Sequence, residues 1–549
     1  MKRKWWKEGI VYQIYPKSFK DSNNDGIGDI KGIIEKIPYL KDLGINIIWL
    51  NPIYDSPNDD NGYDIRNYQA ILQEFGTMED FDLLLNELHK NNIKLIMDLV
   101  VNHSSDEHNW FVESRKSKDN KYRDYYIWQN EKPNNWGSFF GGSSWEFDEL
   151  TKEYYLHLFS KKQPDLNWEN ENLRNDVYSL MKWWLDKGID GFRMDVINMI
   201  AKNPLYPSNP SLMSNGFEDG SKYFLNLPKV HDYLQEMNKK VLSNYDVMTV
   251  GECPGTSPKD AILFSEDKRN ELSMIFQFEL MDIDGTDNKW NYKKWNLKDF
   301  KEIINKWQIG LEHEGWNSIY LMNHDRPRAI SRFGNDKEYR KESGKLLSML
   351  TLSLKGTPYI YQGEEIGMTN IAFDSIKDYK DIETLNYYKE VINNENINSI
   401  MDKIHYSSRD NSRTPMQWNN QEFGGFSESN PWIKINPNYI DINVEESLKD
   451  EFSILNFYKE MIKFRKNNLA LVYGTFTNLD INNENLYSYL RSDNENSFLI
   501  LLNFSEEKIN FELPEEINSK NKELKIKNYK TPSNFGELKP YEGQIIKLK

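Results

Sequence analysis

Ionisable side chains stand at the ends of several short apolar segments of the sequence. Arg193 and Asp195 close residues 191–195, Glu252 closes residues 247–252, and Asp325 follows residues 318–322. Other polar residues accompany them: Asp98, Asn102, His103, Asn323 and His324. Each could be a satisfied structural group if taken singly. Together they would be expensive to bury without a ligand, because every buried carboxylate needs a partner or a shifted pKa.

Such a carboxylate cluster could hold a metal or carry acid, base and nucleophile chemistry. Against a catalytic metal, the sequence has no His-Glu-x-x-His motif, and Arg193 would compete with a cation. Cys253 is the single cysteine, which excludes a cysteine-based zinc site and an intrachain disulfide. No phosphate-binding Gly-x-x-x-x-Gly-Lys loop or dinucleotide fingerprint is present. Glycoside hydrolysis remains, since it needs an ionised nucleophile and a protonated acid.

The segments that carry these residues alternate with helical patterns. Eight of them have strand length: residues 11–15, 45–50, 95–101, 191–195, 247–252, 274–278, 318–322 and 358–361. Apolar residues at helical spacing fill residues 30–43, 78–90, 173–187, 230–242, 297–311 and 342–354. This alternation predicts a (β/α)8 barrel of the TIM type, with an open doubly wound sheet as the alternative. A barrel would gather the strand ends at one mouth.

Two interruptions and a change of pattern predict the domain organisation. Residues 104–172 lack helical periodicity and follow the third strand, which indicates an inserted subdomain. Residues 366–450 form a second polar excursion. From residue 472 short alternating runs predict a C-terminal antiparallel β-sandwich. We therefore expect a barrel over 1–103 and 173–471, an insertion over 104–172 and a sandwich over 472–549.

Composition limits the partners of the chain. Its 549 residues carry a formal net charge of −16 and 14% aromatic residues. This negative field disfavours nucleic acid and anionic lipid, and no apolar run is long enough to span a membrane. One cysteine and no signal-like apolar stretch predict a cytoplasmic protein. We expect a monomer that acts on a small neutral ligand without an organic cofactor.

Four motifs in order closely resemble the conserved regions of the α-amylase superfamily of glycoside hydrolases. They are residues 98–103 (DLVVNH), 191–195 (GFRMD), 250–252 (VGE) and 323–325 (NHD), with a fifth, 163–168 (QPDLNW), inside the insertion. Further runs resemble the branch that holds oligo-1,6-glucosidases, dextran glucosidases and trehalose-6-phosphate hydrolases. These are residues 5–6, 12–16, 61–65, 359–365 and 409–418.

The resemblance implies a retaining mechanism. Asp195 would be the nucleophile that forms a covalent β-glucosyl-enzyme, and Glu252 would be the acid and then the base. Asp325 would hold substrate hydroxyls and stabilise the transition state. Arg193 should keep Asp195 ionised, whereas Glu252 needs a raised pKa. Retention predicts that the two carboxyl groups lie about 5–5.5 Å apart.

The same resemblance implies a blind pocket for one terminal glucose. His103 and His324 would bind hydroxyls of that glucose, and Asp64 would pair with Arg409 to close the non-reducing end. Tyr63 would be the stacking floor. Two further aromatic residues are candidates for the pocket wall: Phe140 and Phe159.

Val196, directly after the nucleophile, is associated in this branch with α-1,6 preference. Its stiff β-branched side chain would shape the leaving-group side; simple inward packing is the alternative. Trehalose-6-phosphate hydrolases also carry Val here, so that activity stays open, as does a sucrose-active glucosidase or isomerase. A non-catalytic transporter-associated relative would need a membrane anchor. Arg326 and Cys253 depart from the Gln and Met usual in the branch.

Residues 21–29 (DSNNDGIGD) place oxygen ligands as an EF-hand loop does, with Gly26 at the sixth position. The bidentate Glu of that motif is missing, since Gly32 stands there. The related branch has a structural calcium at the matching loop, which implies five ligand residues: Asp21, Asn23, Asp25, Ile27 through its carbonyl, and Asp29. An Asn/Asp/Gly turn without an ion is the alternative.

Overall fold

A closed parallel barrel forms the centre of the molecule in our computed structural model, which describes residues 3–286 and 288–549. Its strands are β1 (Val11–Ile14), β2 (Ile47–Leu50), β5 (Lys94–Leu99), β9 (Gly191–Met194), β10 (Met248–Glu252), β11 (Met274–Phe276), β12 (Ser318–Ile319) and β13 (Thr357–Tyr361). They pair in the order β11-β10-β9-β5-β2-β1-β13-β12. A parallel bridge between Ile275 and Asn317 joins the two outer strands. The predicted (β/α)8 barrel is therefore confirmed.

Helices surround this barrel. They are α4 (Met78–Lys90), α6 (Glu171–Lys187), α7 (Lys229–Lys240), α8 (Pro258–Ser265), α9 (Leu297–Gly310), α10 (Ala329–Phe333) and α11 (Arg340–Ser353). Of these, α4, α6, α7, α9 and α11 lie within two residues of their predicted positions, whereas α8 and α10 were not predicted. The helix predicted over residues 30–43 is instead two helices, α2 (Ile30–Glu35) and α3 (Ile37–Leu43). Pro38 lies in the first turn of α3, where the lack of an N–H is tolerated. It also ends the hydrogen-bond ladder of α2, because proline cannot donate to the carbonyl four residues before it.

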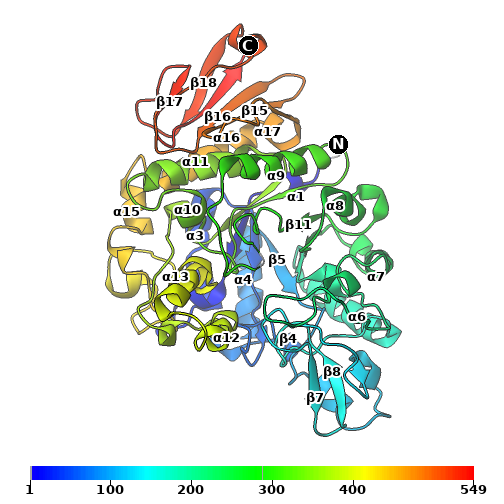
Figure 1. Cartoon of the computed structure of the whole chain (residues 1–549). Coiled ribbons are helices and arrows are strands. Elements are labelled where there is room, and N and C mark those ends of the chain that lie inside the picture. The colour runs from blue at the N-terminus through cyan, green and yellow to red at the C-terminus, as the bar shows by residue number, and fades with distance from the viewer. Residues whose placement is uncertain (1–2, 287) are drawn as a thin grey trace.

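The segment after β5 builds a small antiparallel sheet. It holds α5 (Asn109–Ser114) and the strands β6 (Trp128–Gln129), β8 (Glu153–Leu156) and β7 (Trp145–Asp148), paired in that order. A separate hairpin-like pair, β3 (Tyr54–Asp55) and β4 (Asn67–Ile71), follows β2. Figure 1 shows the β7–β8 sheet at one end of the molecule, beside the barrel.

The excursion after β13 is mostly short helices. These are α12 (Ile382–Val391), α13 (Ile397–Ser407), α14 (Asp410–Arg413) and α15 (Val444–Lys449). In Figure 1, α12 and α13 lie toward the same end of the molecule as β7 and β8. Two excursions far apart in sequence thus flank one end of the barrel.

The last part of the chain forms antiparallel sheets at the opposite end (Figure 1). Helices α16 (Ile454–Asn467) and α17 (Ala470–Tyr473) lead into five strands, paired in the order β14 (Thr475–Asn478), β15 (Leu486–Ser492), β16 (Ser497–Asn503), β20 (Gly543–Leu548) and β18 (Lys522–Lys527). A second pair, β17 (Ile509–Asn510) with β19 (Glu537–Leu538), completes the fold together with α18 (Glu515–Asn518). The exact domain limits at residues 103, 172 and 471 stay predictions.

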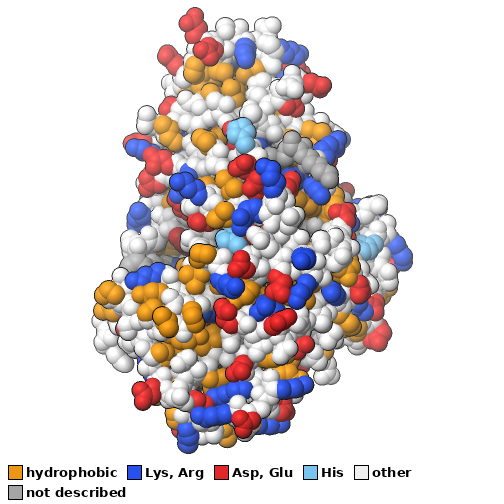
Figure 2. Space-filling model, turned by 90° about the vertical axis from the view of Figure 1, so that its right-hand side faces the viewer, with side chains coloured by type: hydrophobic (Ala, Val, Ile, Leu, Met, Phe, Trp, Pro, Cys, Tyr) orange, Lys and Arg blue, Asp and Glu red, His pale blue; other side chains and the backbone are white. Residues whose placement is uncertain are grey.

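The surface mixes both signs of charge. Figure 2 shows Lys and Arg side chains interspersed with Asp and Glu over one face of the molecule. Over residues 3–286 and 288–549, no helix combines the length and the apolar character that a membrane crossing requires.

Candidate functional site

The strand register brings four charged side chains to one end of the barrel. Asp98 of β5 is level with Arg193 of β9, and Arg193 is level with Val250 of β10. Asp195 directly follows β9, and Glu252 is the last residue of β10. Because parallel strands that are in register end together, residues separated by more than 150 positions meet at one mouth.

Arg193 joins three of these carboxylates. One guanidinium nitrogen, Nη1, lies 2.7 Å from Asp98 Oδ1 and 2.6 Å from Asp195 Oδ1. The other, Nη2, lies 2.5 Å from Glu252 Oε2. The Arg193 side chain is 1% exposed, so these charge-assisted bonds form away from water and fix the carboxylates relative to one another.

The environment separates the protonation of the two predicted catalytic carboxyls. Burial raises the pKa of Asp195 to about 6, although Arg193 lowers it. Burial raises the pKa of Glu252 to about 8, and the nearby negative charges of Asp195 and Asp325 add to this against the effect of Arg193. At neutral pH one carboxyl is therefore ionised and the other protonated, as a nucleophile and an acid require.

Asp325 lies against two arginines from the excursion after β13. Its Oδ1 accepts from Arg413 Nη2 at 2.6 Å and from Arg409 Nη1 at 3.3 Å. Burial opposes ionisation of Asp325, but the adjacent His324 and the two guanidinium groups hold its pKa well below the ordinary value. The side chain is thus a fixed anion, and carboxylate oxygens are suited to accept hydrogen bonds from hydroxyl groups.

The partner of Arg409 is Asp60, so the predicted pairing with Asp64 was wrong. Arg409 Nη2 lies 3.0 Å from Asp60 Oδ1. Asp64 is fully buried and accepts from Ser56 Oγ and from the backbone N–H groups of Asp59 and Asp60. Its carboxylate thus closes the turn that holds Asp60 in place. Asp60 and Asp64 are four positions apart in one loop, and their spacing alone does not tell which of them faces Arg409.

Aromatic rings and both predicted histidines line the same region. The Tyr63 ring stacks on His324 with centroids 5.3 Å apart, and Phe159 lies 5.2 Å from His103. Phe140 packs edge-on against Phe159, and the Arg409 guanidinium lies 5.0 Å above the Phe140 ring. These contacts join six predicted pocket residues: Tyr63, His103, His324, Phe140, Phe159 and Arg409. Asp64 is instead buried in the turn behind Asp60.

Val196 has a backbone that β-branched residues rarely adopt. Its φ of 33° and ψ of 42° fall in the left-handed region. The side chain packs with apolar residues of the segment after β5, including Trp145 and Leu156. Its N–H lies 3.2 Å from Glu252 Oε2 and donates to it. Strain of this kind clusters at functional sites because the surrounding contacts must hold it.

Several residues of the site were not predicted. Asp60 and Gln163 stand in or beside the motifs, but nothing in their spacing tells which neighbour faces inward. Asp381, at 2.5 Å from Arg409 Nη2, lies in a segment without a pattern. Arg413 belongs to the run 409–418, and its distance of four residues from Arg409 could have suggested a second inward-facing arginine on one helical turn.

The loop that contains residues 21–29 turns its oxygens toward its own backbone. Asp21 accepts from the N–H groups of Asn23, Asn24 and Gly26, and Asp25 accepts from Ile27 N. Asp29 accepts from Ser22 and caps α2 through Gly32 N. Among the described residues, no group of three or more His, Cys, Asp or Glu is arranged to hold a metal ion.

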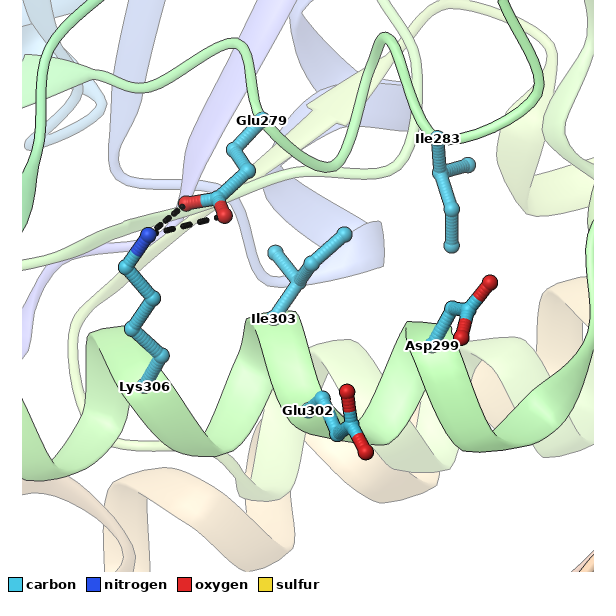
Figure 3. Close-up of a pocket in the computed structure, with 6 residues that line it drawn as sticks. All are labelled: Glu279, Ile283, Asp299, Glu302, Ile303 and Lys306. Carbon is cyan, nitrogen blue, oxygen red and sulfur yellow. Dashed lines mark hydrogen bonds and ion pairs between the residues drawn. The ribbon is translucent and has the colours of Figure 1, made fainter.

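A surface hollow lies elsewhere, between α9 and the segment after β11 (Figure 3). Its lining residues are Glu279, Ile283, Asp299, Glu302, Ile303 and Lys306. None of the predicted site residues lines it. Lys306 donates to both carboxylate oxygens of Glu279.

Comparisons with known proteins identify the family of the chain. Residues 13–474 match the model of the alpha amylase catalytic domain. The chain is 56% identical to an oligo-1,6-glucosidase of Bacillus cereus, with full coverage of both chains. It is also similar to two solved structures, each with 44% identity, full coverage of both chains and a TM-score of 0.95. One is a mutant trehalose-6-phosphate hydrolase of Bacillus licheniformis, and the other is an isomaltulose synthase of Klebsiella sp. LX3.

Proposed function

The chain belongs to the α-amylase family of glycoside hydrolases, and from this premise we propose a specific activity for it. It is a retaining, exo-acting α-glucosidase that hydrolyses terminal α-1,6-glucosidic bonds of isomaltose, panose and short isomalto-oligosaccharides. One observation carries the proposal: the single guanidinium of Arg193 holds both Asp195 and Glu252. Two carboxyls on one guanidinium are close enough for the short separation of retaining enzymes.

The two carboxyls divide the reaction into two steps. Asp195 attacks C1 of the terminal glucose while Glu252 gives its proton to the leaving oxygen, so that the glycosidic bond breaks and a β-glucosyl ester forms. Glu252, now ionised, takes a proton from water, which attacks C1 and releases Asp195. The raised pKa of Glu252 supports the first role, since a carboxyl at its ordinary pKa would hold no proton at pH 7.

The closed end of the pocket supports removal of one terminal glucose at a time. Asp60, Arg409 and Asp325 form a chain of ion pairs, which in this proposal closes the pocket beyond the first sugar. Tyr63 and the two histidines surround the first glucose in this proposal, with Phe140 and Phe159 as its apolar wall.

The α-1,6 linkage rests on Val196 and on the named relatives. In this proposal the rigid β-branched side chain of Val196 shapes the leaving-group side: the Val196 backbone is strained, and its N–H donates to Glu252. Oligo-1,6-glucosidases of Bacillus cereus and Parageobacillus thermoglucosidasius share 56% and 55% identity with this chain.

Trehalose 6-phosphate and sucrose are the competing substrates. A phosphorylated leaving group needs uncompensated cations beside the site. Arg326, next to Asp325, instead bonds Asp282 at 2.8 Å, and Lys289 bonds Glu383. These pairs favour a neutral leaving group over a phosphate.

A substrate panel tests the proposal. Isomaltose, panose, maltose, sucrose and trehalose 6-phosphate are incubated with the enzyme, and the anomer of the released glucose is followed by NMR. We expect turnover of the α-1,6 substrates with α-glucose appearing first, and at least a 10³-fold loss of kcat in Asp195→Asn. Turnover of trehalose 6-phosphate alone, or β-glucose as first product, would contradict the assignment.

We further propose a structural calcium ion at residues 21–29. Side-chain oxygens of Asp21, Asn23 and Asp25 with the Ile27 carbonyl form a donor set of the kind that calcium prefers, and Asp29 lies at the end of the loop. The ion would be distant from the catalytic residues.

We also propose that the protein is cytoplasmic and monomeric. The single cysteine supports a location in a reducing compartment.

Chelation tests the calcium proposal. Because an ion that binds only the folded chain adds to its stability, EDTA should lower Tm by several degrees, and added calcium should restore it. Asp25→Ala should lower Tm in buffer and abolish the response to EDTA. An unchanged Tm of the wild-type protein under EDTA would argue for a turn without an ion.

A further inference from the structure

Lys202 is a buried cation behind the predicted substrate-binding residue His103. It lies in the segment after β9, and its side chain is 4% exposed. Its ammonium lies 2.7 Å from Asp165 Oδ2 and 2.7 Å from Asn102 Oδ1. Asp165 is fully buried, and its Oδ1 accepts from Leu158 N, so both oxygens of this acid have fixed partners. Lys202 thus connects the segments after β9 and β5 with the insertion.

These contacts fix the orientation of the Asn102 amide. An ammonium can only donate, so the atom of Asn102 that faces Lys202 must be the carbonyl oxygen. The amide nitrogen then points the other way, 3.2 Å from Asp165 Oδ2 and 3.2 Å from His103 Nδ1. A carboxylate beside this nitrogen favours the same orientation, since it can only accept.

The amide in turn decides which nitrogen of His103 carries the proton. Nδ1 accepts from Asn102, and in a neutral imidazole the other nitrogen, Nε2, must then be protonated. Gln163 Nε2 lies 3.3 Å from His103 Nε2. Its two hydrogens already have acceptors in Asp60 Oδ2 and the Tyr63 carbonyl, so it does not require His103 Nε2 to accept. The arrangement has one consistent set of donors and acceptors.

We propose that Lys202 is a positioning residue that sets the tautomer of His103 through Asn102, so that Nε2–H serves as a donor at the glucose pocket. The identity of the ligand rests on the proposed glucosidase function, whereas the tautomer of His103 follows from the contacts alone. Without the ammonium, the Asn102 amide could rotate, and His103 would populate both tautomers.

Nitrogen NMR reads the tautomer without any activity measurement. In ¹⁵N-histidine-labelled protein, the His103 signals are identified by their loss in His103→Ala. We expect a protonated Nε2 in the wild type. In Asn102→Asp the new carboxylate can only accept, so the proton should move to Nδ1. A wild-type His103 protonated at Nδ1 would overturn the proposal.

Kinetics test whether Lys202 acts through His103. Lys202→Met should lower kcat/KM for isomaltose about tenfold, the effect of one lost well-placed hydrogen bond, and Lys202→Arg should recover part of it. In a His103→Ala background, Lys202→Met should have little further effect. Additive losses, or a Lys202→Met variant with wild-type kcat/KM, would overturn the proposal.

A matched control separates positioning from general stability. Lys345, another buried lysine, donates to the Asn528 carbonyl far from the site. Lys345→Met should lower Tm and leave kcat/KM unchanged. If the wild type hydrolyses no α-glucoside, the proposed function fails, whereas the NMR result still decides the tautomer.

Discussion

At the scale of single residues, one arginine explains how two similar acids take different roles. Burial raises the pKa of both Asp195 and Glu252, and Arg193 lowers both. Glu252 lies near the negative charges of Asp195 and Asp325, whereas Asp195 lies near that of Asp98 and its pKa is also lowered by a hydrogen bond with Glu252. The positive charge of Arg193 is therefore shared, while the neighbouring negative charges differ between the two carboxyls. The difference between acid and nucleophile arises from this surrounding charge and not from residue type.

The difference in pKa between Asp195 and Glu252 predicts a bell-shaped dependence of kcat/KM on pH. Asp195 must be ionised, so activity should fall as pH drops below about 6. Glu252 must be protonated, so activity should fall as pH rises above about 8. The profile is measured with isomaltose, and its two limbs report the coupled pair. With an aryl glucoside whose leaving group needs no proton, Glu252→Gln should lose the alkaline limb. An alkaline limb retained in that variant would contradict the assignment.

At the scale of elements, the turn between β3 and β4 separates a binding role from a structural one. Asp60 faces Arg409, and Asp64 closes the turn beneath it. Asp60→Asn should therefore lower kcat/KM at least tenfold with little change in Tm, since it weakens a charge-assisted contact at the pocket. Asp64→Ala should lower the free energy of unfolding by about 1–3 kcal/mol, because buried donors lose their acceptor. Kinetics and thermal unfolding of both variants check this, and equal kinetic losses with equal Tm would show that the two acids are not distinct.

The same turn shows what sequence could and could not predict. Strand ends that carry Asp195, Glu252 and Asp325 were predictable, because the barrel fixes where strands end and the motifs mark the residues. The break of the helix at Lys36 was not predicted, although Pro38 carried the signal. Asp60 and Asp381 could not be predicted, because loop geometry depends on tertiary contacts to Arg409 that no local spacing encodes.

At the scale of the whole molecule, buried cations join the C-terminal sheets to the barrel through backbone carbonyls. Lys301 of α9 donates to the carbonyls of Asp480, Asn483 and Leu486. Lys345 of α11 donates to the Asn528 carbonyl. Since carbonyl oxygens at helix ends and turns lack intrahelical partners, a buried cation can satisfy several of them at once. This interface therefore depends on hydrogen bonds as well as on apolar packing.

Arg491 of β15 offers the sharpest test of this interface. Its guanidinium is fully buried and donates to five backbone carbonyls in and around α11, α17 and the start of β14, namely those of Ser353, Ala470, Leu471, Gly474 and Thr475. Arg491→Met would leave these acceptors without donors, and we expect a loss of at least about 3 kcal/mol in the free energy of unfolding. Urea unfolding measures it. Lys466→Met, which removes one exposed bond to the Gly44 carbonyl, should change stability by less than about 0.5 kcal/mol. Because Arg491 lies at the end of the barrel opposite the mouth, the folded variant should keep wild-type kcat/KM at low temperature; equal stability of the two variants would show that apolar packing alone holds the sheets in place.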